Sequence, residues 1–202
     1  MKVQIPESWK DIELKQFQKY NYEVHKDIND TTKLIQTIST LCDINFNDAS
    51  KMSIKDVKKI TGYLAQMLEQ VPETFITKFR HNGIDYGFIP KLDEISIGEY
   101  ADLEFYLTET SEIWNNMHLI MSILYREIEE DGNPYKIKDY KPNKEIAEGF
   151  KSLSMDIVYS ASNFFLTLGE ELLETIGSST QETEEIRVQI KKTIETTGDG
   201  LK

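Results

Sequence analysis

One stretch, residues 75–107, constrains the fold more than any other part of the chain. The Asn82–Gly83 pair suits a two-residue type I′ turn, because both central positions of that turn need a positive φ. Apolar residues alternate on both sides of this pair, which predicts two paired strands with one apolar face. Ser96 and Glu99 fit a capping box, so a helix is expected to begin soon after the second strand.

Most of the remaining chain has the three-to-four-residue apolar spacing of amphipathic helices. Expected helices cover about 13–28, 30–42, 53–71, 97–107, 112–129, 143–152, 154–176 and 180–197. The expected apolar face holds Ile54, Val57, Leu64 and Leu68 in the helix at 53–71, and Tyr100, Leu103 and Leu107 in the helix at 97–107. A loop is expected at 42–50, and short strands are expected near Val3–Ile5 and at 135–137. The predicted fold class is therefore mainly α (α+β), a multi-helix bundle packed around one β-hairpin, with a projecting C-terminal helix.

The expected domain organisation is one domain with an appended arm. Residues 1–177 are predicted to form a single helical domain, with the hairpin at about 75–90, and residues 178–202 a C-terminal helical arm for partner contact. The apolar stripe of this arm has three isoleucines at four-residue spacing, which is too thin for a core helix and suits a groove on a partner. The arm can also pack weakly on its own domain. The candidate partner-binding residues are Ile186, Ile190, Ile194, Arg187 and Lys191.

The charge balance argues against contact with phosphate backbones. Lys and Arg total 23 against 35 Asp and Glu, which gives a formal net charge of −12. Such a chain is repelled by nucleic acid and by anionic lipid. The excess acid serves solubility, or it forms a face that meets a basic partner or mimics DNA. No apolar run approaches the ~20 residues of a membrane span and the first residues lack an apolar leader, so neither secretion by a signal peptide nor membrane insertion is expected.

The sequence contains no recognisable catalytic, cofactor-binding or metal-binding motif. Phosphate-binding and nucleotide-binding glycine loops and the GxSxG elbow are missing from the sequence. The carboxylates at 93, 94, 99 and 102 could hold a divalent ion, although a capping role for Glu99 and a solvated face for the others is the favoured interpretation. His118 is expected to be partly buried and hydrogen-bonded, and His81 to be exposed. Cys42 lies at a core-facing position and is expected to be a buried, inert thiol. The protein is therefore expected not to be an enzyme and to need no cofactor.

Three sequence blocks carry a resemblance to a known group of proteins. They are IPESWKDIELKQFQKY at 5–20, YGFIPKLDEISIGEYADLE at 86–104 and MHLIMSILYREI at 117–128. Together with Phe164–Phe165 and the 169–172 segment, they resemble small structural and morphogenesis proteins of tailed bacteriophages, in particular crAss-like phages and their relatives. The blocks mark a family and do not form a functional motif, because their residues are typical of turn, cap and core positions.

This resemblance implies one of two roles. The first is a virion subunit of the portal–tail region, such as a connector or tail ring protein, which forms a homo-oligomeric ring and contacts other phage structural proteins. The second is a tail assembly chaperone that is absent from the mature particle. An internal cargo protein or an unrecognised enzyme are further alternatives. The first role implies assembly in the host cytoplasm and location in the virion, with no membrane and no specific nucleic-acid binding, although DNA can pass through the ring lumen.

Overall fold

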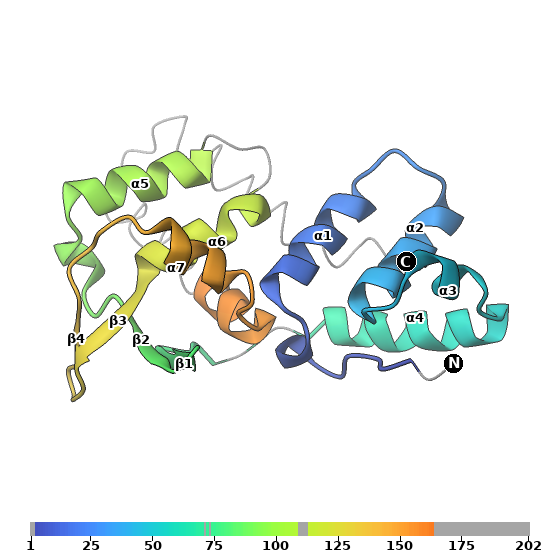
Figure 1. The fold of residues 1–202 in the computed structure, drawn as a ribbon, viewed down its shortest axis with the longest axis horizontal. Coiled ribbons are helices and arrows are strands. Elements are labelled where there is room, and N and C mark those ends of the chain that lie inside the picture. Colours follow the sequence, from blue (N-terminus) through green and yellow to red (C-terminus); the bar gives the residue numbers. More distant parts are fainter. Residues whose placement is uncertain (1–2, 71, 73, 109–112, 164–202) are drawn as a thin grey trace.

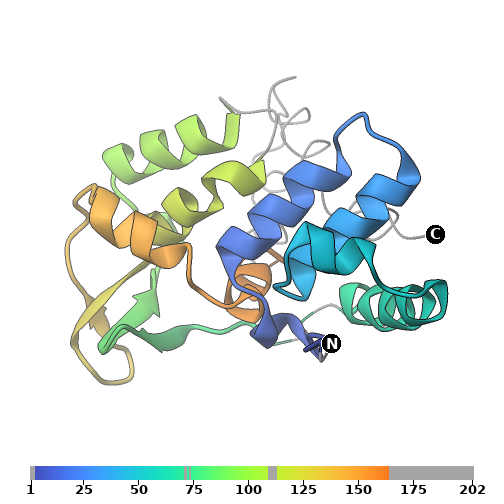
Figure 2. The same cartoon turned by 45° about the vertical axis from the view of Figure 1, so that its right-hand side comes forward.

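The computed structural model describes residues 3–70, 72, 74–108 and 113–163. These residues form two lobes side by side along the long axis (Figure 1). One lobe holds the first four α-helices, and the other holds a small antiparallel sheet and the later helices. After a turn of 45°, the two groups of elements still lie on opposite sides of the view, and α1 lies next to α6 where they meet (Figure 2). The class predicted from the sequence, mainly helical with a small β component, is confirmed.

In the first lobe, three successive helices each begin after a polar residue that caps the helix N-terminus. Asn29, Asn45 and Ser53 each accept a hydrogen bond from a backbone N–H in the first turn of the helix that follows. Each cap satisfies a donor that the helix itself leaves unpaired. The elements are the 3₁₀ turn η1 (Trp9–Asp11), α1 (Leu14–Val24), α2 (Asp30–Leu41), α3 (Phe46–Ser50) and α4 (Ile54–Leu68).

The sheet of the second lobe has four antiparallel strands in the order β1-β2-β3-β4. They are β1 (Lys78–His81), β2 (Ile84–Phe88), β3 (Tyr125–Glu130) and β4 (Lys136–Ile137). Asn82 and Gly83 both have positive φ, at 49° and 81°, as the type I′ turn requires. Rings from three strands then meet on one face, where Phe79 lies 5.6 Å from Tyr86 and 4.9 Å from Tyr125 between centroids. These aromatic contacts across strands stabilise the predicted hairpin.

Helices cover this sheet. They are the 3₁₀ turn η2 (Leu92–Glu94), α5 (Ile97–Thr108), α6 (Ile113–Leu124) and α7 (Lys144–Phe150), followed by a helix whose described part is 155–163. The side chain of Phe150 is buried against Phe79 and Tyr86 of the hairpin. It therefore joins α7 to the apolar side of the sheet.

One aromatic cluster joins the two lobes into a single core. Trp9 stacks on Tyr159 at 5.1 Å, and Trp114 lies 4.8 Å from Phe17 in an edge-to-face contact and 6.1 Å from Tyr159. All four rings are buried. Backbone hydrogen bonds support the junction, since Leu14 N–H donates to the Leu153 carbonyl and Met155 N–H to the Ile12 carbonyl, each at 2.8 Å. The lobes are thus held in a fixed relation.

Several boundaries predicted from the sequence are wrong. The helix expected to run to residue 129 ends at Leu124, because the next residues pair with β2 and bury Tyr125 among the sheet aromatics. Residues 46–50, expected as a loop, form α3 after its Asn45 cap. Residues 3–5 are not a strand, although Trp9 beyond them is buried as expected. The expected arm, 178–202, lies outside the described residues.

The close approach of Tyr135 to Gly87 gives a stability prediction. A Cβ at position 87 would overlap the Tyr135 ring, whose hydroxyl donates to the Phe88 carbonyl at 2.7 Å. We expect Gly87→Ala to lower the free energy of unfolding by about 1–3 kcal/mol through overpacking, measured by denaturant unfolding. Gly62→Ala on α4 is the matched control, since no atom lies within 4 Å of its Cβ position. That variant should gain about 0.5–1 kcal/mol from helix propensity, and equal effects at both positions would contradict the close approach.

Candidate interaction surfaces

Three of the four carboxylates considered as an ion site, Glu94, Glu99 and Asp102, serve separate structural roles, and the side chain of Asp93 lies outside the described part of the structure. Glu99 and Ser96 form the predicted capping box, with Ser96 N–H donating to Glu99 Oε2 at 2.7 Å and Glu99 N–H donating to Ser96 Oγ at 3.2 Å. Asp102 accepts a hydrogen bond from the Tyr140 hydroxyl at 2.7 Å, and Glu94 pairs with Lys91 at 2.5 Å. No group of three or more metal-ligating side chains occurs within residues 3–70, 74–108 and 113–163.

A buried ion pair anchors α5 to the sheet. Arg126 Nη1 of β3 lies 2.9 Å from Glu99 Oε1, and both side chains are largely buried. Glu99 Oε1 accepts no well-aligned hydrogen bond, so the attraction between the Glu99 carboxylate and the Arg126 guanidinium is mainly coulombic. Because Glu99 points inward together with Leu103, the opposite side of α5 faces solvent.

The outward side of α5 is apolar, and we call it the α5 surface. Ile97 is 89% exposed, Tyr100 55% and Phe105 54%, and the exposed residues Ala101 and Glu104 lie between them. Positions 97, 101 and 105 follow a four-residue spacing, which places them along one face of the helix. Exposed apolar groups that are contiguous in this way indicate an interaction site.

Sequence periodicity predicted the buried side of α5 correctly at Leu103 and Leu107 and wrongly at Tyr100. Tyr100 was expected in the buried stripe with Leu103 and Leu107, but it is exposed while Glu99 is buried. The helix is apolar on both sides, so spacing alone does not choose the buried side. The Glu99–Arg126 ion pair determines which side of α5 is buried. The second apolar stripe, at positions 97, 101 and 105, was the feature of the sequence that could have indicated an exposed apolar side of this helix.

A second surface lies on α4, and we call it the α4 surface. It consists of Ile54, which is 77% exposed, half-exposed Tyr63, and the exposed lysines at 55, 58 and 59. Ile54 was expected to be buried with Val57 and Leu64. It lies instead in the first turn of α4, away from the buried side of the helix formed by Ile60, Leu64 and Met67.

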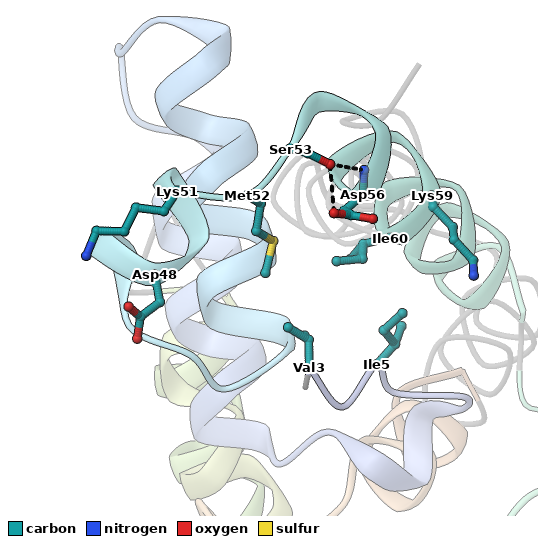
Figure 3. Close-up of a pocket in the computed structure, with 9 residues that line it drawn as sticks. All are labelled: Val3, Ile5, Asp48, Lys51, Met52, Ser53, Asp56, Lys59 and Ile60. Carbon is teal, nitrogen blue, oxygen red and sulfur yellow. Dashed lines mark hydrogen bonds between the residues drawn. The ribbon is translucent and has the colours of Figure 1, made fainter. Parts of the chain in front are cut away.

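Beside the α4 surface lies an open groove of about 570 Å³ (Figure 3). Val3, Ile5, Met52 and Ile60 supply apolar groups on its walls, and the polar residues Asp48, Lys51, Ser53, Asp56 and Lys59 complete its lining. Asp56 is engaged within the groove, because its carboxylate accepts from Ser53 Oγ at 2.7 Å and its backbone N–H donates to the same oxygen at 3.1 Å. The groove thus extends the α4 surface with apolar and charged groups and presents no activated nucleophile.

The histidines and the cysteine lie in structural positions. His118 is buried, with Nδ1 3.4 Å from Gln18 Nε2 and Nε2 3.5 Å from Glu148 Oε1. His81 is half-buried rather than exposed, and its Nε2 lies 3.1 Å from the Gly149 carbonyl oxygen. Burial raises the pKa of the Cys42 thiol to about 11, which agrees with the expected inert cysteine.

The residues proposed from the sequence for partner binding lie outside the described part of the chain, so they stay a prediction. They are Ile186, Ile190, Ile194, Arg187 and Lys191. Among the helices of the described residues, none combines the length and the apolar character needed to cross a membrane. Comparisons of the chain with protein-family models, with curated proteins and with solved structures found no match.

The buried ion pair predicts a large effect of removing one partner. Arg126→Met should lower the free energy of unfolding by about 3–5 kcal/mol, because Glu99 is left buried without its counter-charge. Adding Glu99→Gln to that variant should recover part of the loss, measured by denaturant unfolding. Lys138→Met, which breaks the more exposed pair with Glu127, is the matched control and should cost under about 1 kcal/mol. A double variant less stable than Arg126→Met would contradict this account.

Burial of His118 predicts a pH dependence of stability. Burial lowers the pKa of His118 below 6.5, the nearby Lys151 ammonium lowers it further, and Glu148 partly offsets both. The unfolded chain therefore binds the proton more readily, and stability falls as pH drops below the ordinary histidine range. The free energy of unfolding should decrease between pH about 7.5 and 5.5, and His118→Gln should flatten that slope. An unchanged slope in the variant would contradict the assignment.

Proposed function

We propose that this protein is a non-enzymatic structural subunit of a tailed-bacteriophage virion, located in the portal–tail region as a connector or tail ring protein. The observation that carries the proposal is a pair of chemically different surfaces, on α4 and α5, held apart on one rigid core. A ring subunit needs two unlike contact surfaces, because each copy meets one neighbour on each side through a heterologous contact. The phage assignment itself rests on the sequence blocks at 5–20, 86–104 and 117–128.

The fixed relation of the lobes supports this role. The α4 surface belongs to the first lobe and the α5 surface to the second, at different ends of the long axis (Figure 1). The aromatic cluster of Trp9, Phe17, Trp114 and Tyr159 lies between them. A rigid body sets the angle between successive copies, and a constant angle is what closes a ring.

The net charge of −12 suits a subunit beside a DNA passage. Acidic residues that face a lumen repel the phosphate backbone, so DNA passes without binding. The same charge provides attraction for basic surfaces of neighbouring proteins. In this proposal, the partners are other virion proteins and further copies of this chain, assembled in the host cytoplasm.

Quantitative mass spectrometry of purified virions tests the proposal. We expect the protein in the particle at a copy number near that of the portal protein or a small multiple of it. Its absence from virions, together with its presence on tail precursors in infected-cell lysate, would overturn the proposal in favour of a tail assembly chaperone.

Two variants separate the possible contact regions within such a particle. Ile97→Lys changes an exposed side chain, so stability should change by no more than about 0.5 kcal/mol, while incorporation into virions should fall strongly. Replacing Ile186, Ile190 and Ile194 together by serine tests the predicted C-terminal contact in the same assay. Lys141→Ser, at an exposed position that belongs to neither α4 nor α5, is the control and should be incorporated normally. Normal incorporation of the Ile97 variant would remove α5 from the contact.

A further inference from the structure

The α4 surface and the groove beside it are basic in an otherwise acidic protein. Residues 51–63 carry a formal charge of +3, from four lysines at 51, 55, 58 and 59 and one aspartate at 56, whereas the whole chain carries −12. All four lysines are exposed. Within the described residues, none of them forms an ion pair with a carboxylate. Their charges are therefore available to an acidic partner.

The groove combines this charge with apolar surface. Lys51 and Lys59 flank it in Figure 3, and the apolar side chains of its walls lie between them. Further along α4, the Lys59 ammonium lies 5.9 Å from the centre of the half-exposed Tyr63 ring. A partner that fits this surface carries acidic and apolar side chains close together.

The C-terminal part of the chain carries such a combination in its sequence. Residues 164–202 lie outside the described part of the chain. From 164 to 186 there are six glutamates, at 170, 171, 174, 182, 184 and 185, and no lysine or arginine. The last three of these glutamates directly precede Ile186, the first isoleucine of the predicted partner-binding stripe. A short stretch of the chain therefore joins acids to an apolar anchor.

We propose that residues 178–186 of one copy, which we call the docking segment, bind in the groove beside α4 of a neighbouring copy. The glutamates at 182, 184 and 185 pair with the α4 lysines, and Ile186 packs on the apolar walls of the groove. The inference rests on the proposed function in taking copies of this chain as neighbours. It adds to that function the surface that receives the predicted C-terminal contact.

Chain length and charge both allow this contact between copies. The residues from 164 to 178 join the end of the described part to the docking segment, and when extended they span at most about 50 Å. That distance exceeds the radius of gyration of about 15 Å expected for a domain of this size, so the docking segment can reach a neighbouring copy. The acidic remainder of that copy repels an acidic segment, so the lysines also make the contact specific.

Carbodiimide coupling of the full-length chain tests the inference. The reagent joins a lysine amine to a carboxylate in contact with it through an amide bond, with loss of water, so it detects ion pairs directly. Equal amounts of unlabelled and heavy-isotope-labelled protein are mixed before coupling. Peptide mass spectrometry then identifies which residues are joined and whether they come from one copy or from two.

The expected result is an amide between the glutamates of the docking segment and the lysines of α4, with labelled peptides joined to unlabelled ones. The coupling yield at the α4 lysines should exceed by about tenfold that at Lys141 and Lys144, because docking raises the effective concentration of the reacting groups. Lys141 and Lys144 are the matched controls, since both are exposed and neither belongs to α4.

Exchange of charges separates the contact from an effect on folding. Lys58→Glu with Lys59→Glu should lower the coupling yield about tenfold while the circular dichroism spectrum is retained. Mixing this variant with a second one, Glu184→Lys with Glu185→Lys, should restore coupling between the two variants, because opposite charges again meet across the contact. Lys141→Glu is the control and should leave the yield unchanged.

Three other outcomes overturn the inference. Coupling only between peptides of the same isotopic form would show that the docking segment binds its own copy. Yields at α4 no higher than at Lys141 would show that the segment and the groove do not meet, and coupling of the α4 lysines to other carboxylates would show a different occupant. These results are distinct from failure of the proposed function, which is measured by presence in virions. A virion protein without this coupling would keep its structural role.

Discussion

The contact between the aromatic rings of the two lobes is the interaction on which the rest of the structure depends. Trp9 stacks on Tyr159 while Trp114 packs on Phe17, and each such pair contributes about 0.5–1.5 kcal/mol beyond the area it buries. The indole N–H of Trp9 donates to the Gln70 carbonyl at 2.5 Å, so the same residue also holds the segment that follows α4. Together with the backbone hydrogen bonds beside it, this junction holds the first lobe against the lobe of the sheet and the later helices. With it, two distant surfaces keep one geometry.

A buried charge decides which side of α5 meets solvent. Glu99 accepts a hydrogen bond from the Ser96 N–H with Oε2, and its Oε1 pairs with Arg126. Rotation of α5 about its axis would break both contacts. Breaking them would leave charge in the interior, which costs more than exposing an isoleucine. The helix therefore leaves Ile97 and Phe105 in water. Because the ion pair keeps these apolar side chains in water in the monomer, their burial against a partner lowers the free energy. The internal ion pair is linked to the proposed assembly in this way.

The sequence predicted the features that depend on neighbouring residues. The type I′ turn at Asn82–Gly83, the Ser96–Glu99 capping box and the Ser53 cap are all present, because turn and cap chemistry is local. Features that depend on contacts between residues far apart in the sequence were not predicted. The change from helix to strand at Tyr125 depends on pairing with β2, and the exposure of Tyr100 depends on Arg126, which lies 26 positions further along the chain. Both interaction surfaces were missed for this reason, since spacing shows that a helix is apolar and does not show which side another element covers.

Sedimentation velocity of the purified full-length chain, over a range of concentrations at low and high salt, tests the central claim most directly. We predict one closed oligomer of more than two copies at low salt, and its partial dissociation at high salt, because salt weakens contacts between charged surfaces of neighbouring copies. A chain that stays monomeric throughout, or a dimer insensitive to salt, would contradict an assembly built from two unlike surfaces on a rigid body.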